Sequence, residues 1–312
     1  MPLASFDELY QDADRRAARV TVAVAGGADR TVIEALHNAV ERGWVRPLVV
    51  GQEREIRQVA DQSGHRLQGF TLVESEDPAG QAVALVRSGQ AQLLMKGQIA
   101  TPTLLRAMLD PTTGLRTCRV ICQVVLMEVF IRPEGKTDGP AVARRFLLAD
   151  TGICIHPTVD QNADILQSAV EVAHRLGETR PKVALLAATE KVDAAMPETI
   201  DAAELQRRHQ AGEIPGAVVE GPLSFDLAVA PDASEKKRVG GSVPGAADVL
   251  LFPNLLSGNL TVTALMCAAA CRFGGILCGA ACPEVFMSRA DTATTRLNSL
   301  ALALALAQGL PE

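Results

Sequence analysis

The chain has 312 residues, of which 48% are hydrophobic and 21% charged, with a formal net charge of −6. This balance is that of an ordinary globular protein. Aromatic residues make up only 3% and no basic stripe is present, which argues against a nucleic-acid platform of stacking rings and clustered cations. The N-terminus lacks an apolar signal core, and no apolar run reaches the roughly 18 residues of a membrane span. We therefore expect a cytoplasmic protein that contacts neither membrane nor nucleic acid.

The first third of the chain alternates short apolar runs with amphipathic segments. A helix is predicted from about Glu53, and Thr101-Pro102 suits the cap and first position of another helix. The helix that starts at Thr101 is predicted to cover residues 101–109, and two further helices are predicted at 30–42 and 81–87. The predicted strands are 20–25, 47–50, 71–73 and 92–95.

The middle of the chain is β-rich at 119–131 and 144–149, around a Gly-, Pro- and charge-rich segment that predicts a hairpin loop or a domain crossing. Alternation then resumes. The predicted helices are 160–176, 200–210, 260–272 and 292–307, and the strands 182–187, 217–220, 249–252 and 275–277.

Strands that are apolar almost throughout indicate mostly parallel sheets covered on both faces, hence an α/β fold. The length and the β-rich break predict two α/β domains with a cleft between them. The first comprises residues 1–145 plus 287–312, and the second residues 146–286. In such folds ligands bind at the carboxyl ends of the strands.

The seven cysteines are an odd number, which argues against a disulfide framework. Four of them are spaced as two pairs one helical turn apart, but they lie in a segment rich in Ala and Gly, where Cys acts as a small apolar residue. We therefore expect no metal site. These four are Cys267, Cys271, Cys278 and Cys282.

The segment Ser288-Arg289-Ala290-Asp291 precedes the last predicted helix and combines a hydroxyl, a cation and a carboxylate. An arginine fork holds phosphate oxygens bidentately, and helix N-terminal amides favour an anion. A carboxylate beside them is placed to take a proton. Ser and Asp are also preferred helix caps. The segment is therefore either a site for phosphate or acyl phosphate chemistry or a plain helix cap.

Polar residues also follow the other strands. Lys96 ends an apolar strand, Thr101 begins the next helix, and Arg106 adds a third cation. A capped helix with a solvated lysine is the alternative. The glycine turn at 25–29 lacks the spacing of a nucleotide-binding loop and is interpreted as a tight turn. Further candidates for ligand contact, for which turn formation is the competing explanation, are Asp150, Thr158, Asp226, Asn254, Gly258 and Asn259.

The motifs, in the order in which they occur along the chain, resemble those of the phosphate acetyltransferase/phosphate butyryltransferase family, and more closely those of its butyryltransferase branch. The resemblance covers nearly the whole chain. The matching pieces are VAVAGGADRTVIEAL, LLMKGQIATPTLLRAML, LLADTGICIHPT, KVALLAATEKV, EGPLSFDLAV, ADVLLFPNLLSGN and SRADTATTRLNSLALA.

The resemblance implies two domains like those of isocitrate and isopropylmalate dehydrogenases, with coenzyme A and phosphate bound in the cleft. It implies the reversible reaction acyl-CoA + phosphate ⇌ acyl phosphate + CoA, with coenzyme A as substrate and no separate cofactor. It also implies a homodimer or higher homo-oligomer. Ser288 and Arg289 match the active-site motif, and Arg106 matches a phosphate ligand. Asp291 is the candidate base.

Three departures from the family pattern leave an alternative open. Thr295 stands where acetyltransferases have an important aspartate, Val262-Thr263 replaces a usual Tyr-Lys pair, and Cys122-Gln123 replaces Ser-His. These favour, as the alternative, a non-catalytic or divergent paralogue that binds coenzyme A or acyl phosphate. A decarboxylating dehydrogenase is disfavoured, because the only tyrosine is Tyr10 in the N-terminal helix.

Overall fold

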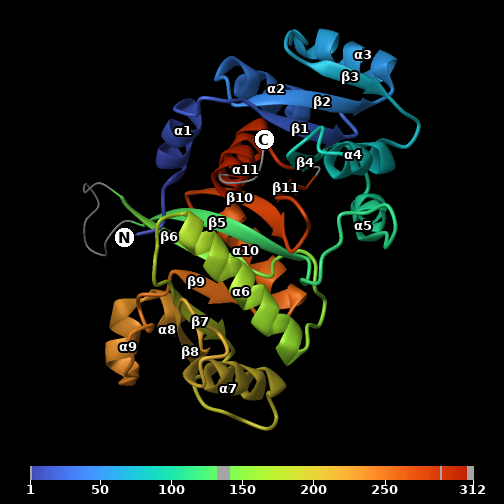
Figure 1. Cartoon of the computed structure of the whole chain (residues 1–312). Coiled ribbons are helices and arrows are strands. Elements are labelled where there is room, and N and C mark those ends of the chain that lie inside the picture. The colour runs from blue at the N-terminus through green and yellow to red at the C-terminus, as the bar shows by residue number, and fades with distance from the viewer. Residues whose placement is uncertain (1, 132–140, 289, 308–312) are drawn as a thin grey trace. The chain divides into compact units, whose positions relative to one another are not determined.

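The computed structural model describes residues 2–131, 141–288 and 290–307. The chain divides into two compact units (Figure 1). One, here called the terminal unit, comprises residues 6–119 and 273–312. The other, the central unit, comprises residues 1–5 and 120–272. Both are mixed α/β units with mostly parallel strands, as the apolar strand pattern predicts.

The sheet of the terminal unit has the strand order β3-β2-β1-β4-β11-β10. Its pairs are parallel except β10 with β11. β4 lies beside β1, and the carboxyl ends of these two strands carry the glycine turn and Lys96. The strands are β1 (Val20–Ala25), β2 (Val45–Gly51), β3 (Thr71–Glu74), β4 (Leu93–Lys96), β10 (Cys271–Cys278, of which residues 273–278 belong to this unit) and β11 (Glu284–Val285).

The last helix of the chain packs against α1, α2 and β11, all in the terminal unit. Its residues from Thr295 to Leu304 are all buried. The run LALALAL is apolar on every face of the helix, which suits a helix segment that is buried all round. The helices of this unit are α1 (Phe6–Asp14), α2 (Arg30–Glu41), α3 (Glu53–Ser63), α4 (Pro78–Arg87), α5 (Thr101–Leu109) and α11 (Ala293–Leu306).

The sheet of the central unit has the order β5-β6-β9-β7-β8. β5 and β6 are antiparallel, with Ile131 opposite Val142, so the β-rich break is a hairpin. Its connection at 132–140 lies outside the described residues. The elements are β5 (Cys122–Ile131), β6 (Val142–Ala149), α6 (Val159–Arg175), β7 (Lys182–Leu186), α7 (Pro197–Gln210), β8 (Val218–Leu223), α8 (Phe225–Val229), α9 (Pro231–Lys237), β9 (Val249–Leu251) and α10 (Leu255–Ala268).

Two local predictions are wrong. The helix expected at 260–272 is α10 at 255–268, because the Asn254 side chain accepts the amide of Ser257 and starts the helix earlier. The residues from Cys271 belong to β10 instead. Thr101 is the first residue of α5 rather than its cap, since Ala100 occupies the cap position and makes no side-chain bond there. No helix in the described part of the chain is long and apolar enough to cross a membrane.

Candidate functional site

The turn from Ser288 to Asp291 is closed by hydrogen bonds within itself. The Ser288 amide donates to Asp291 Oδ2 at 2.6 Å, and the Asp291 amide donates back to the Ser288 carbonyl at 3.2 Å. Thr292 caps α11, because its hydroxyl accepts the Thr295 amide at 3.1 Å. The interpretation of Asp291 as the cap of this helix is therefore wrong. Ser288 is exposed, and Arg289 lies outside the described residues.

The Asp291 carboxylate is mostly buried. Burial raises its pKa, while the Ser288 amide, Arg296 and Lys96 act in the opposite direction. Its side chain reaches the surface with only 9% exposure. A carboxylate whose pKa is raised toward the working pH is a better general base than an ordinary aspartate.

Arg296 on α11 was not singled out by the sequence, yet it binds this turn. Its side chain is fully buried. It donates from Nη2 to the Ser288 carbonyl at 3.0 Å, from Nε to Thr31 Oγ1 at 2.9 Å and from Nη1 to the Lys96 carbonyl at 3.5 Å. Burial lowers the pKa of Arg296, while the charges of Asp29 and Asp291 act in the opposite direction. The signal in the sequence is a lone cation within an otherwise uncharged helix.

Lys96 comes to the same turn from β4. Its side chain is 1% exposed, so the interpretation as a solvated lysine is wrong. Its Nζ lies 3.3 Å from the Met287 carbonyl oxygen and 3.5 Å from that of Gly97. It also lies 5.9 Å from the centre of the Phe286 ring. The lysine that ends β4 and the serine turn after β11 thus lie next to each other.

Glu284 is a second buried group that the sequence did not reveal. It is fully buried on β11, and neither carboxylate oxygen has a hydrogen-bond partner among the described residues. Glu284 lies opposite Leu94 in the sheet. Leu94 is two residues before Lys96 on the same strand, so the side chains of Glu284 and Lys96 project from the same face of the sheet. Burial raises the pKa of Glu284 well above the ordinary value, with Lys96 opposing. Burial therefore favours the neutral form of this carboxyl group over its charged form.

The loop after β4 packs closely on the glycine turn after β1. The amides of Gly97 and Gln98 donate to the carbonyls of Ala25 and Gly26. A Cβ on Gly97 would lie 2.0 Å from the Gly26 oxygen, so only glycine fits there. The glycine turn thus holds in place, by backbone hydrogen bonds and close packing, the loop that leads from Lys96 into α5.

The remaining terminal-unit candidates lie on α5. Thr101 is partly exposed at its first position. Arg106 is exposed and donates from Nε to the Pro102 carbonyl of its own helix at 3.2 Å. No hydrogen bond within the described residues connects either side chain to the Ser288 turn.

In the central unit, Asp150, Gly258 and Asn259 lie together where β6 ends. Asp150 accepts the amides of residues 123, 152, 153 and 154. Its carboxylate therefore shapes a loop. The Asn259 side chain donates to the Thr151 carbonyl at 3.4 Å. Gly258 allows close approach, since a Cβ there would lie 2.3 Å from the Asp150 oxygen.

Three further candidates in the central unit make local bonds. Thr158 caps α6 in a capping box with Gln161, and Asn254 caps α10. Asp226 pairs with Lys237 at 2.9 Å. Lys237, followed by Ser224, lowers the pKa of Asp226 to about 2. Turn and cap formation thus accounts for the present contacts of these side chains.

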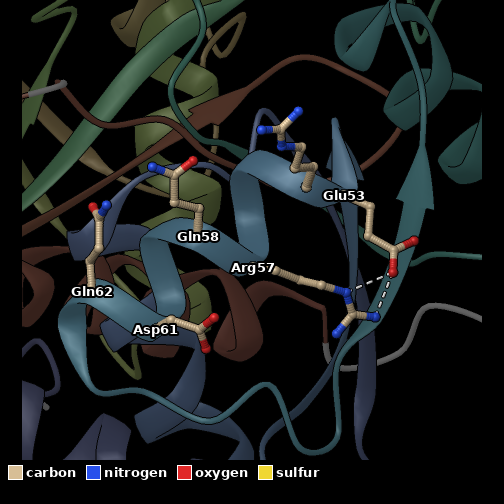
Figure 2. Close-up of a pocket in the computed structure, with 6 residues that line it drawn as sticks. Glu53, Arg57, Gln58, Asp61 and Gln62 are labelled. Atoms are coloured by element: carbon tan, nitrogen blue, oxygen red, sulfur yellow. Dashed lines mark hydrogen bonds and ion pairs between the residues drawn. The ribbon is translucent and has the colours of Figure 1, made fainter.

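The surface hollow on α3, shown in Figure 2, does not coincide with these residues. It has a volume of about 680 Å³ and is lined by one helix, from Glu53 to Gln62. Its labelled Arg57 is paired with Glu53 at 2.8 Å. The side chains of Arg57 and Glu53 are 58% and 42% exposed, so neither is desolvated as a group for chemistry would be.

The family follows from comparison with known proteins. Residues 73–304 match the sequence pattern of the family described as phosphate acetyl/butaryl transferase. The chain belongs to this family. It is 36% identical to the phosphate butyryltransferase of Clostridium acetobutylicum, over 98% of this chain and 99% of the relative. It is also 36% identical to the phosphate acetyltransferase of Rhizobium meliloti, over 96% and 92% of the two chains.

A solved structure agrees with this assignment. The branched-chain phosphotransacylase from Enterococcus faecalis V583 shares 30% identity with a TM-score of 0.78, covering 93% of this chain and 99% of that one. The resemblance drawn from the sequence motifs is thereby confirmed, and the chain is an acyltransferase enzyme. The lone tyrosine, Tyr10, donates to Asn298 at 2.8 Å, a contact that ties α1 to α11.

Proposed function

We propose that the protein catalyses the reversible transfer of a short acyl group, butyryl or one of similar size, between coenzyme A and inorganic phosphate. The observation that carries this proposal is the Ser288 turn. It presents an exposed serine, while Arg296 and Asp291 contact its backbone and Lys96 contacts the carbonyl of Met287 just before it. Such a buried cluster with fixed donors suits the stabilisation of an oxyanion.

In the direction of acyl-CoA formation, the thiol of coenzyme A attacks the carbonyl carbon of the acyl phosphate. The S–H bond breaks and its proton goes to Asp291, because a thiol with a pKa of about 8.5 must be deprotonated to attack. The new C–S bond forms as the C–O bond to phosphate breaks. Ser288 donates to the oxyanion, and Arg289, Arg106 and Lys96 hold the phosphate. Proximity of two bound substrates removes the need for a covalent enzyme intermediate.

We assign substrate binding to the remaining candidates and no cofactor beyond the substrates. Asn259 is exposed beside the Asp150 loop, which supports a role for it in binding substrate. Thr101 begins α5, whose N-terminus favours an anion. The other residues that we assign to the binding of coenzyme A or phosphate are Asp150, Thr158, Asp226, Asn254 and Gly258; in the structure they form a loop, caps, an ion pair and a close backbone approach.

We further propose two domains of the isocitrate dehydrogenase kind, residues 1–145 plus 287–312 and residues 146–286. The division of the chain into two compact units with mostly parallel strands supports two domains, although the units divide the chain at other residues, between 119 and 120 and between 272 and 273. We place the enzyme in the cytoplasm, which its seven free cysteines support.

We also propose a homodimer or higher homo-oligomer. The uncharged helix α10 leaves Leu256 and Leu260 exposed by 68% and 60%. They lie one helical turn apart, so they share one exposed apolar face. Such a face is typical of a protein interface.

An assay of purified protein with coenzyme A and a panel of acyl phosphates tests the activity. We expect new thioester absorbance, with the highest kcat/KM for a short acyl group such as butyryl. The alternative is a paralogue that binds coenzyme A without turnover. It rests on the absence of the Tyr-Lys pair, whose positions are taken by Val262, which is buried, and Thr263, which is exposed. Binding of coenzyme A with no thioester from any acyl phosphate would establish that alternative.

A further inference from the structure

Arg296 joins three segments that are far apart in the sequence. Its guanidinium contacts Thr31 in the first turn of α2, the carbonyl of Lys96 at the end of β4, and the carbonyl of Ser288. A guanidinium carries five N–H donors in a fixed planar fork. One rigid group therefore sets the spacing between a loop, a strand end and the serine turn.

Ser288 is held on both sides of its Cα atom. Its amide is bound by Asp291 at 2.6 Å, and its carbonyl by Arg296 at 3.0 Å. With both flanking peptide groups bound, little rotation about the backbone of Ser288 is left. Ser288 is nevertheless an exposed residue, and its hydroxyl accepts the Ala290 amide at 3.3 Å. The backbone is therefore fixed while the side chain remains accessible.

Stability alone does not account for an arginine here. The side chain is fully buried in a helix whose other buried positions are apolar or small and uncharged. Burying a charge carries a large desolvation cost, and a well-packed apolar side chain at such a site is often no less stabilising. What an apolar side chain does not supply is the pair of bonds to the Ser288 and Lys96 carbonyls.

We propose that Arg296 is a positioning residue for acyl transfer, which fixes the backbone from which the Ser288 hydroxyl and the Lys96 ammonium project. This inference rests on the proposed function. Arg296 acts through the protein in this proposal, because its side chain is fully buried and each of its three nitrogens donates to a protein oxygen. Displacement of a reacting group by about 1 Å lowers a rate by up to about 100-fold. Loss of Arg296 therefore lowers kcat more than it raises the KM for coenzyme A.

The test compares Arg296→Met and Arg296→Lys in the full chain, with coenzyme A and butyryl phosphate as substrates. We expect kcat to fall by roughly ten-fold or more in Arg296→Met, with the KM for coenzyme A changed by no more than about two-fold. Arg296→Lys keeps the charge but not the fork, so it restores only part of kcat.

Arg16 supplies a matched control. Its Nη1 donates to the Leu304 carbonyl, at the other end of the same helix, at 2.9 Å. Arg16→Met removes an arginine–carbonyl bond from α11 without touching the serine turn. It is expected to lower the melting temperature and leave kcat unchanged. A wild-type kcat in Arg296→Met, or equal losses of kcat in both variants at matched stability, would overturn the proposal.

Amide hydrogen exchange gives a readout that does not need turnover. We expect the Ser288 amide to exchange faster in Arg296→Met and at the wild-type rate in Arg16→Met. Unchanged exchange at Ser288 in Arg296→Met contradicts the positioning role even if the enzyme acts on other substrates. Absence of thioester from the wild-type protein, with the exchange result as expected, contradicts the proposed function alone.

Discussion

Asp291 binds the Ser288 amide, while Thr292 caps the helix that follows. The two interpretations that the sequence left open for this segment are thereby separated. Because the carboxylate is not needed to start α11, its position beside an exposed serine fits a role in proton transfer.

Asp291→Asn tests that role. The amide oxygen of asparagine still accepts from Ser288, but it does not take a proton. We expect kcat to fall by about ten-fold or more. Wild-type kcat/KM should fall as the pH drops through the raised pKa of Asp291, because the base becomes protonated. The variant should lack this acidic limb in its pH–rate profile.

The control for Asp291→Asn is Thr292→Ala, which removes the true cap. It should cost about 1 kcal/mol of stability and leave the pH–rate profile unchanged. An Asp291→Asn enzyme with normal kinetics and a lower melting temperature would show that Asp291 serves only the turn.

Glu284 makes a separate prediction about stability. Its pKa in the folded protein is raised above the unfolded value of about 4.3. Its contribution is therefore fully present below the unfolded pKa and is lost as pH rises through the folded pKa. We expect Glu284→Gln, which stays neutral, to lose less thermal stability than the wild type as the pH rises above the unfolded pKa. Equal losses in melting temperature would contradict a raised pKa for the Glu284 carboxyl group.

Sequence patterns singled out Ser288, Asp291 and Lys96 but not Arg296 or Glu284. The first three adjoin strand ends and a helix start, where local signals exist. The last two lie inside a helix and a two-residue strand, and a charged residue there is expected on the surface. Their importance comes from burial against segments distant in the sequence, which a local pattern does not contain.

At the scale of elements, strands such as β1 and helices such as α2 follow from apolar periodicity and match closely. The segment after Asn254 does not. Its run of Ala and Cys residues favours a helix through 272, but residues from Cys271 pair within the sheet and become β10. Tertiary pairing overrides local preference there. β11 is too short to give a periodic signal.

The exposed face of α10 leads to a prediction at this scale. Introducing charge with Leu256→Glu together with Leu260→Glu should dissociate the proposed oligomer, because a carboxylate is strongly disfavoured in a buried apolar interface. Sedimentation velocity measures the mass in solution. The control is Val192→Glu, an exposed apolar residue outside α10. A mass unchanged by the double substitution would exclude this face as the interface.

At the scale of the whole molecule, the α/β class follows from the alternation of strands and helices, and the family from motifs spread along the chain. The acyl group does not follow from either, because the size of an acyl pocket depends on side chains packed together from several segments. The butyryl preference is drawn from the resemblance of the SRAD segment to one branch of the family.

The decisive measurement is the rate of thioester formation from coenzyme A and acyl phosphates of increasing length. We expect turnover by the purified wild-type protein, with the highest kcat/KM at a short chain such as butyryl. Tight binding of coenzyme A with no thioester from any acyl phosphate would contradict it.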